Sequence, residues 1–410
     1  MNATATTPAA AAGTAPAAGT VVVPAAGTAP ATAPRDGTLA ITGWGVVTSL
    51  AIGADEFTTA VAEGRDGLRD VTGMFEEELP EDRAFAMPGF RVRDHLGRKG
   101  TSFFDRSTAL ALLGCTLALD DTDLTVTDAN RDRVGIVLGT TAGSVKATSD
   151  YSRETLVNDR PYLVNPVLFP NTVMNCAAGQ SAIWHKLKGV NATVAGGQLA
   201  GVSALRYARN QIRRGYADAL LVGSVEEFSP HTAWFAHRQH SAWQERARIG
   251  EGSAVVMVED AAAVRAAGRL PDAEVLAVEA GTYGPPGRTP DAGAGLAACV
   301  LRALERAGAE PSEVRAVATG ACGIGPLDDI ELRGVESALG TEVWQIRAKE
   351  WVGECQSAAG SLQIAALLAG HRSHPELDGE LSVVTSVSAD GSVGAAVLRG
   401  WHRARRDHRS

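Results

Sequence analysis

Short apolar runs alternate with segments of helical periodicity over most of this chain. The runs are rich in Val, Ile and Leu and lie at 38–50, 133–143, 219–227 and 253–260. Between them, apolar residues recur with helical spacing at 107–119 and 201–215. Uninterrupted apolar strands that alternate with helices indicate a buried, largely parallel sheet with helices on its faces.

The same alternation restarts after an Ala-rich helix at 260–268. Strands are predicted at 273–284 and 314–320, helices at 295–308 and 358–370, and a final hairpin at 381–400. We therefore divide the chain into an N-terminal half, 38–268, and a C-terminal half, 269–400. Periodicity alone is compatible with two domains or with one duplicated domain whose sheets are paired.

The two ends of the chain differ from these halves. Residues 1–34 carry no charge, and prolines interrupt them throughout. A secretory signal needs a basic start and a continuous apolar core, and a membrane span needs about 20 strongly apolar residues. We interpret 1–37 as a flexible Ala/Pro leader outside the fold, and 401–410 as a solvated basic tail.

Composition limits the classes of function. The chain has 38 Lys and Arg against 47 Asp and Glu, a net charge of −9, and 5% aromatic residues. Such a chain repels nucleic acid, offers little base-stacking surface, and gives no reason to expect an anionic membrane as partner. The five cysteines are odd in number and lack a zinc-ligand spacing, which favours a reducing cytoplasm and no metal site.

Three glycine-containing stretches are candidates for chemistry. The first, 191–201, is a strand-to-helix turn, a place where a helix N-terminus activates a thiol, but it carries Gln198. In the second, 317–331, the order of the glycines does not fit a dinucleotide-binding turn. The third, 349–360, runs into a helix of small residues. Taken one by one, each stretch is compatible with close packing alone.

Together, in their order and spacing, these stretches resemble the β-ketoacyl synthase group of the thiolase superfamily. The family's N-terminal strand and Gly-rich turn resemble ITGWGVVTSLAIGADEF, its dimer-interface segment resembles PNTVMNCAAGQSAIWHKLKGVNATV, and its joining motif resembles GEGSAVVMVEDAAAVRAAG. The resemblance extends from Thr38 to Arg399. It implies an α/β fold, a thiolase-like αβαβα five-layer sandwich built as one unit from two similar halves.

The catalytic positions of that family are changed here. The resemblance puts the acyl-accepting cysteine at Gln198 and the two histidines at Gly320 and Glu354, and the family's lysine is kept as Lys349. Decarboxylative condensation needs a thiolate and donors for the enolate oxyanion, and losing one such donor costs about 10²–10³ in rate. A glutamate would put negative charge where negative charge must develop. We expect no condensation by this chain alone, and no cofactor.

Other reactive side chains lie close to these positions in the sequence. Cys322 and Cys355 flank the lost histidines, but no base is placed to activate either thiol. Asp328, Asp329 and Glu331 are expected to bond to the preceding loop rather than to act as acid and base.

Two variants of the family carry glutamine at the cysteine position. In the chain-length factor, or ketosynthase β subunit, of bacterial type II polyketide synthases, the whole triad is lost and the subunit pairs with an active ketosynthase α subunit. In the decarboxylating loading-type ketosynthase the histidines remain, and malonyl carrier protein is decarboxylated. The residues at 320 and 354 fit the first variant better. It implies a cytoplasmic heterodimer that acts on chains held by the phosphopantetheine of an acyl carrier protein, for which the basic tail is a further candidate contact.

The resemblance also indicates where such a subunit would shape its product. Side chains at the dimer interface limit the elongation tunnel, and the corresponding residues here are Gly143, Ser144, Val145, Ala147 and Thr148. Their small size predicts an open tunnel for a long or reduced chain such as a polyene, and the alternative is that they only begin a helix. The interface candidates are Phe169, Asn171, Thr172, Met174 and Asn175.

Overall fold

The computed structural model describes residues 36–243, 247–283, 292–321 and 325–402. The predicted leader, apart from residues 36 and 37, and the predicted tail, apart from residues 401 and 402, therefore lie outside the described residues. Cys322 lies outside them as well.

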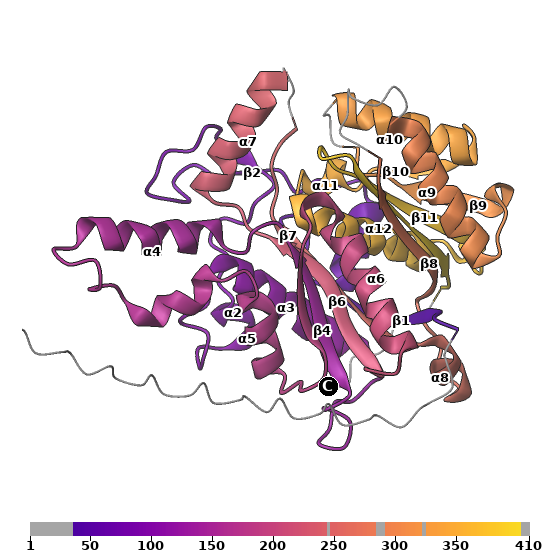
Figure 1. Ribbon diagram of the computed structural model, residues 1–410, viewed down its shortest axis with the longest axis horizontal. Helices are drawn as coiled ribbons and strands as arrows, with labels where there is room; N and C mark the ends of the chain where they lie inside the picture. Colours follow the sequence, from indigo (N-terminus) through magenta and orange to yellow (C-terminus); the bar gives the residue numbers. More distant parts are fainter. Residues whose placement is uncertain (1–35, 244–246, 284–291, 322–324, 403–410) are drawn as a thin grey trace, which may run out of the picture. The chain divides into compact units, whose positions relative to one another are not determined.

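Ten strands within the described residues form one hydrogen-bonded sheet, in the order β10-β9-β11-β12-β8-β1-β7-β6-β4-β5 (Figure 1). Those of the first half are β1 (Leu39–Thr48), β4 (Val134–Thr140), β5 (Asn191–Ala195), β6 (Ala219–Glu226) and β7 (Gly252–Asp260). Those of the second half are β8 (Ala273–Thr282), β9 (Val314–Ala318), β10 (Trp344–Ile346), β11 (Leu381–Val387) and β12 (Ser392–Gly400). A separate small sheet pairs β2 (Arg69–Asp70) with β3 (Arg83–Ala84).

The two halves repeat one strand order. In each half, the first strand lies beside the fifth, followed by the fourth, the second and the third. Among the described strands, the two halves of the sheet are connected where Leu39–Ile41 of β1 pairs with Ala273–Val275 of β8. The predicted fold of two similar halves is therefore confirmed.

Helices form the other layers of the sandwich. The first half contains α1 (Ala54–Ala62), α2 (Arg93–Leu96), α3 (Arg106–Asp121), α4 (Val145–Val157), η1 (Pro166–Thr172), α5 (Cys176–Trp184), η2 (Gly197–Leu199), α6 (Ala200–Arg213), α7 (Pro230–Trp243) and α8 (Ala261–Ala266). The second half contains α9 (Ala292–Ala307), η3 (Pro311–Glu313), α10 (Gly325–Leu339), α11 (Lys349–Val352), η4 (Gln356–Ala358), α12 (Ala359–Ser373) and η5 (Pro375–Leu377).

The buried apolar clusters follow these layers. One cluster places α6 and α12 between strands of both halves (Figure 1). A second lies between the first half of the sheet and the outer helices α3 and α5, and a third between the second half and α9 and α10. The order is thus helices, sheet, central helices, sheet, helices, as the αβαβα prediction requires.

The prediction of a largely parallel sheet is wrong. Among the described strands of the large sheet, five neighbouring pairs run antiparallel and four run parallel. Both faces of the sheet are nevertheless covered by helices, so antiparallel strands such as β7 are buried along their whole length. A continuous apolar run indicates that both faces of a strand are buried, but it does not indicate whether the strand runs parallel or antiparallel to its neighbours.

Close contact between the central helices requires small residues. A Cβ added at Gly201 of α6 would lie 2.8 Å from the backbone N of Ser361 in α12. The Ser224 hydroxyl donates to the Ser361 hydroxyl across 2.7 Å at the same contact. The predicted small-residue helix after 358 therefore packs directly on another backbone.

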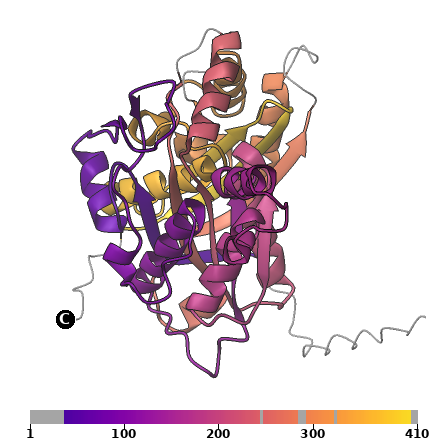
Figure 2. The ribbon, with the colours of Figure 1, turned by 90° about the vertical axis from the view of Figure 1, so that its left-hand side faces the viewer.

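The described residues of the first half carry an extension made of α4, η1 and α5, in which α5 corresponds to the outer helix α10 of the second half and α4 and η1 have no counterpart among the described residues. α4, η1 and α5 lie together on one side of the N-terminal half, with α7 above them (Figure 1), and this side faces the viewer in Figure 2. α4 packs on η1 and α7. This extension contains the predicted tunnel and interface residues.

Candidate functional site

Gln198 lies in η2, the short turn between β5 and α6, and is half-buried. Its backbone carbonyl accepts a hydrogen bond of 2.9 Å from the hydroxyl of Ser386 in β11. The turn of the first half is thereby attached to a strand of the second half.

Gly320 follows β9, and its backbone N–H donates to Glu331 Oε1 across 2.8 Å. The Glu331 carboxylate also accepts from the Thr385 hydroxyl at 2.7 Å, next to the Ser386 that binds the Gln198 carbonyl. Burial raises the pKa of Glu331, against the effect of these two donors and of Lys349. The prediction that Glu331 bonds to the preceding loop is confirmed, although its side chain reaches there from helix α10.

Glu354 forms a buried ion pair. Lys349 Nζ lies 2.6 Å from Glu354 Oε2, and the two residues are 7% and 1% exposed. The other oxygen of Glu354 accepts the backbone N–H of Gln356 at 2.7 Å, where the chain takes a left-handed φ of 45°. A Cβ at Gly320 would lie 3.7 Å from Lys349 Nζ.

The residues at positions 198, 320 and 354 therefore lie around one junction. Gln198 is linked to β11 through Ser386, and Gly320 is linked to the same strand through Glu331. Glu354 reaches this junction through its ion pair with Lys349, whose Nζ lies close to Gly320.

The chemistry of this junction is unlike that of an oxyanion site. The cation of Lys349 pairs with Glu354 and also lowers the pKa of Glu331 against the effect of burial. Burial, with Glu354 among other groups, raises the pKa of a third buried carboxylate, Glu226. Developing negative charge on a ligand would be opposed by these carboxylates. The nearby Cys355 is fully buried, and burial together with neighbouring carboxylates holds its pKa well above the ordinary value, so it is not a thiolate at neutral pH.

The predicted tunnel residues begin α4. Gly143 has a φ of +71°, and an added Cβ would lie 2.7 Å from Met174 Cα, so only glycine fits this turn. Ser144 is buried and caps the helix by accepting the N–H of Ala147 at 3.1 Å. Val145 and Ala147 are partly buried, and Thr148 is exposed. The helix-N-terminus interpretation thus describes this segment, and it leaves the tunnel role as a separate prediction.

The predicted interface residues divide into two groups. Phe169 and Met174 are 54% and 48% exposed, and Asn175 is exposed as well. Asn171, in contrast, is buried and donates from Nδ2 to the Phe103 carbonyl at 2.8 Å, and Thr172 is partly buried. Asn171 therefore holds the segment in place, while its neighbours present apolar side chains.

Two functional candidates were missed from the sequence. Glu226 accepts from the Thr141 hydroxyl and from both the N–H and the hydroxyl of Ser357, and Glu227 accepts from the Ser144 hydroxyl at 2.8 Å and the Lys146 N–H at 2.9 Å. Both carboxylates are almost fully buried. The available signal was a pair of glutamates directly after the apolar run ALLVGSV, where a buried strand ends.

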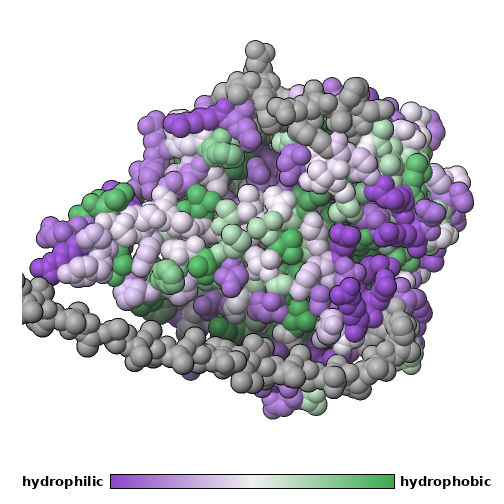
Figure 3. Space-filling model, in the orientation of Figure 1, coloured by the Kyte–Doolittle hydropathy of each residue, from purple (hydrophilic) through white to green (hydrophobic). Residues whose placement is uncertain are grey.

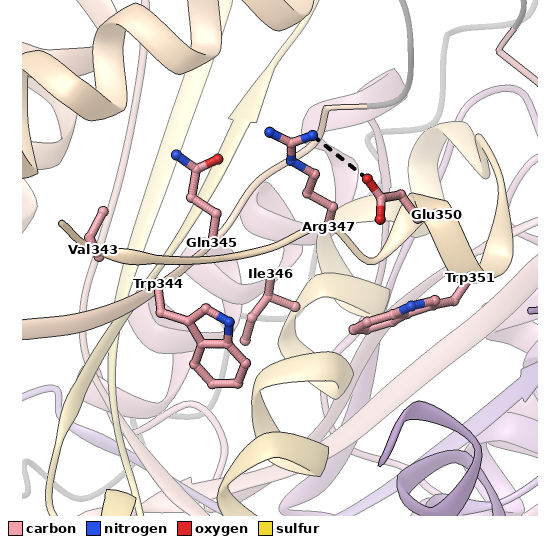
Figure 4. Close-up of a pocket in the computed structure, with 7 residues that line it drawn as sticks. All are labelled: Val343, Trp344, Gln345, Ile346, Arg347, Glu350 and Trp351. Carbon is pink, nitrogen blue, oxygen red and sulfur yellow. Dashed lines mark ion pairs between the residues drawn. The ribbon is translucent and has the colours of Figure 1, made fainter. Parts of the chain in front are cut away.

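A pocket of about 590 Å³ lies at the edge strand β10 (Figure 4). Trp344, Ile346 and Trp351 line it, and Arg347 pairs with Glu350 at 3.7 Å at its rim. None of the predicted site residues lines this pocket. No helix within the described ranges is long and apolar enough to cross a bilayer.

Comparison with known proteins agrees with this arrangement. The family model described as the β-ketoacyl synthase N-terminal domain matches residues 37–263, and the one for the C-terminal domain matches 273–372. The chain is 29% identical over 350 residues to the actinorhodin polyketide putative beta-ketoacyl synthase 2 of Streptomyces coelicolor. The aligned residues make up 81% of this chain and 85% of that protein.

Solved structures give the same result. The ishigamide ketosynthase/chain length factor superposes with a TM-score of 0.77 at 37% identity, covering 89% of this chain and 99% of the other. A type II polyketide ketosynthase in complex with its acyl carrier protein, AntDE:AntF, superposes at 0.76 with 19% identity over 90% and 100% of the chains and supports the fold. The chain belongs to the β-ketoacyl synthase family, has its thiolase-like fold, and falls with the ketosynthase and chain-length-factor proteins of type II polyketide synthases.

Proposed function

We propose that this protein is a non-catalytic chain-length factor that pairs with an active ketosynthase and shapes the tunnel in which the polyketide is elongated. The observation that carries the proposal is the junction of Gln198, Gly320 and Glu354. It offers no thiol at the acyl-accepting position and sets buried carboxylates where an enolate would need donors.

The surface supports pairing with a second subunit. A set of large apolar side chains is exposed on and beside the extension of α4, η1 and α5: Phe103, Leu156, Val157, Tyr162, Leu163, Val167, Phe169, Val173, Met174 and Ile183. Hydrophobic patches lie over this region in Figure 3. Large apolar side chains exposed together in one region mark protein interfaces.

An open strand edge lies in the same half. β5 is the last strand of the sheet, paired only with β4, and its residues Asn-Ala-Thr-Val-Ala carry no charge or proline that would block further pairing. We therefore place the partner ketosynthase α subunit across β5 and the apolar side chains beside it. The growing chain would be delivered on the phosphopantetheine of an acyl carrier protein.

Co-expression with an intact Cys-His-His ketosynthase tests this function. We expect a stable heterodimer by size measurement, acylation confined to the partner subunit, and a polyketide made only when both subunits are present. A self-paired dimer that ignores the ketosynthase, or acylation and elongation by this chain alone, would contradict the proposal.

The tunnel role is tested on α4. Ala147→Phe and Thr148→Phe should each shorten the product of the complex, because they add bulk at the predicted tunnel wall. Arg153→Phe places the same aromatic ring on the opposite face of the helix and should leave product length unchanged. If all three variants give products of wild-type length, α4 does not form part of the tunnel wall.

The alternative is a glutamine-type decarboxylase that makes starter units from malonyl carrier protein. Gln198 is the observation that favours it. Purified chain would then release CO₂ from malonyl carrier protein, and Gln198→Ala would abolish the release. We expect no turnover, because the donors that such an enzyme needs are replaced by Gly320 and Glu354.

A further inference from the structure

The helix that carries the predicted tunnel residues has little apolar anchorage. None of the thirteen described residues of α4 is buried, and the helix packs on η1 and α7 rather than on the large sheet. Most helices in proteins are held by an apolar face that packs on the core. The contacts of α4 are the aromatic contact of Tyr151 with Phe169 and polar contacts, among which those of its first turn and of Glu154 lie near its ends.

The contacts at its N-terminus converge on one side chain. Glu227 follows β6 directly, is 1% exposed, and accepts from the hydroxyl of the capping residue Ser144 and from the backbone N–H of Lys146. A carboxylate that accepts two donors at a helix N-terminus is stabilised by both hydrogen bonds and the helix dipole. Glu227 thus connects the end of β6 to the first turn of a helix that has no buried residue of its own.

The neighbouring carboxylate ties the same strand end to the site described above. Glu226 accepts from Thr141, three residues before the cap, and from Ser357, three residues after Glu354. The other charged groups around Glu227 are Asp105 and Glu226, both of which raise its pKa, and Arg106, which is paired with Glu251. Among the described residues, no cationic side chain lies within 4.0 Å of the Glu227 carboxylate, so its hydrogen bonds to α4 are its main stabilising contacts.

We propose that Glu227 is a positioning residue that fixes the N-terminal turn of α4 and thereby sets the length at which the product stops growing. The inference rests on the proposed function of the α4 segment as a tunnel wall. Loss of the contact lets the first turn shift, so that the wall no longer stops the chain at one length. The result is a broader set of products rather than a uniformly shorter one.

The test uses the complex with the ketosynthase and reads product length by mass spectrometry. For Glu227→Ala we expect the share of the main product to fall roughly two-fold or more as neighbouring lengths appear, since small displacements of a shaped site change its outcome strongly. Glu227→Gln keeps one acceptor and should lie between the wild type and Glu227→Ala. Ser144→Ala removes one donor and should broaden the products in the same direction.

Asp150→Ala is the matched control. Asp150 is a carboxylate of the same helix that pairs with the Lys146 side chain at 2.8 Å instead of its backbone, and its removal should leave the product distribution unchanged. A Glu227 that matters only for folding would lower the yield of complex and leave the distribution of the remaining product as in the wild type, which would overturn the proposal. Glu227→Gln, which keeps the size of the side chain, protects the test if Glu227→Ala does not fold.

The experiments distinguish the tunnel role of α4 from the positioning role of Glu227. If Ala147→Phe and Thr148→Phe leave product length unchanged, the tunnel role itself is wrong. If they shorten the product while Glu227→Ala, Glu227→Gln and Ser144→Ala leave its distribution sharp, the tunnel role stands and the positioning role of Glu227 is wrong.

Discussion

Two buried glutamates in this protein are stabilised in opposite ways. Glu354 lies where the family resemblance predicts a histidine, and it is paired with the ammonium of Lys349. Glu227 lies at the end of β6 and is held by a hydroxyl and a backbone N–H. A buried ion pair is sensitive to the loss of either charge, whereas a carboxylate held by neutral donors is sensitive to pH. The first contact lies inside the junction of Gln198, Gly320 and Glu354, and the second attaches the peripheral helix α4.

The largest effect is expected at the ion pair. Lys349→Met leaves Glu354 buried without its paired cation and Glu331 without a nearby positive charge, and should lower the free energy of unfolding by about 3–5 kcal/mol. Adding Glu354→Gln removes one of the two stranded charges and should recover much of that loss. Denaturant unfolding of the two single variants and the double variant measures this coupling. Additive losses in the double variant would show that the two side chains do not act as a pair.

A smaller, pH-dependent effect is expected at Glu227. Burial and neighbouring carboxylates raise its pKa from an ordinary 4.5 to about 7, so the folded protein keeps a proton that the unfolded chain has lost between these values. Stability should therefore fall as pH rises through this window, by on the order of 1–3 kcal/mol for this group. Glu227→Gln should flatten that part of the profile. The pKa values of Glu226 and Glu331 are also raised, and these two groups account for any dependence of stability on pH that remains in the variant. A profile unaffected by Glu227→Gln would contradict the assignment.

The smallest effect is expected for a carboxylate that is not buried. Asp150 and Lys146 form an exposed pair one helical turn apart on α4. Asp150→Ala should change the free energy of unfolding by less than about 0.5 kcal/mol, because solvent screens such pairs. Thermal unfolding at low and high salt checks this. If Asp150→Ala lowered the free energy of unfolding as much as Lys349→Met, burial would not explain the difference expected between Glu354 and Asp150.

Much of the fold could be predicted from local pattern. The apolar runs at 219–227 and 253–260 and the helical spacing at 201–215 correspond to β6, β7 and α6. Strand direction could not be predicted, because a strand covered on both faces is apolar whichever way it runs. The contacts of Glu331 were also only partly predictable, because its side chain reaches Thr385 only once α10 has packed over β11.

The sequence by itself determined which chemical groups are present. Through its resemblance to the β-ketoacyl synthases, it predicted that Gln198, Gly320 and Glu354 stand where a condensing enzyme has a thiol and two imidazoles, and it indicated that one α/β pattern occurs twice. Only the tertiary structure decided that these three positions meet across the two halves, that Lys349 neutralises Glu354, and that Glu227 reaches the first turn of α4. Side-chain identity and periodicity are local properties of the chain, whereas these contacts join residues far apart in sequence and exist only once the layers have packed.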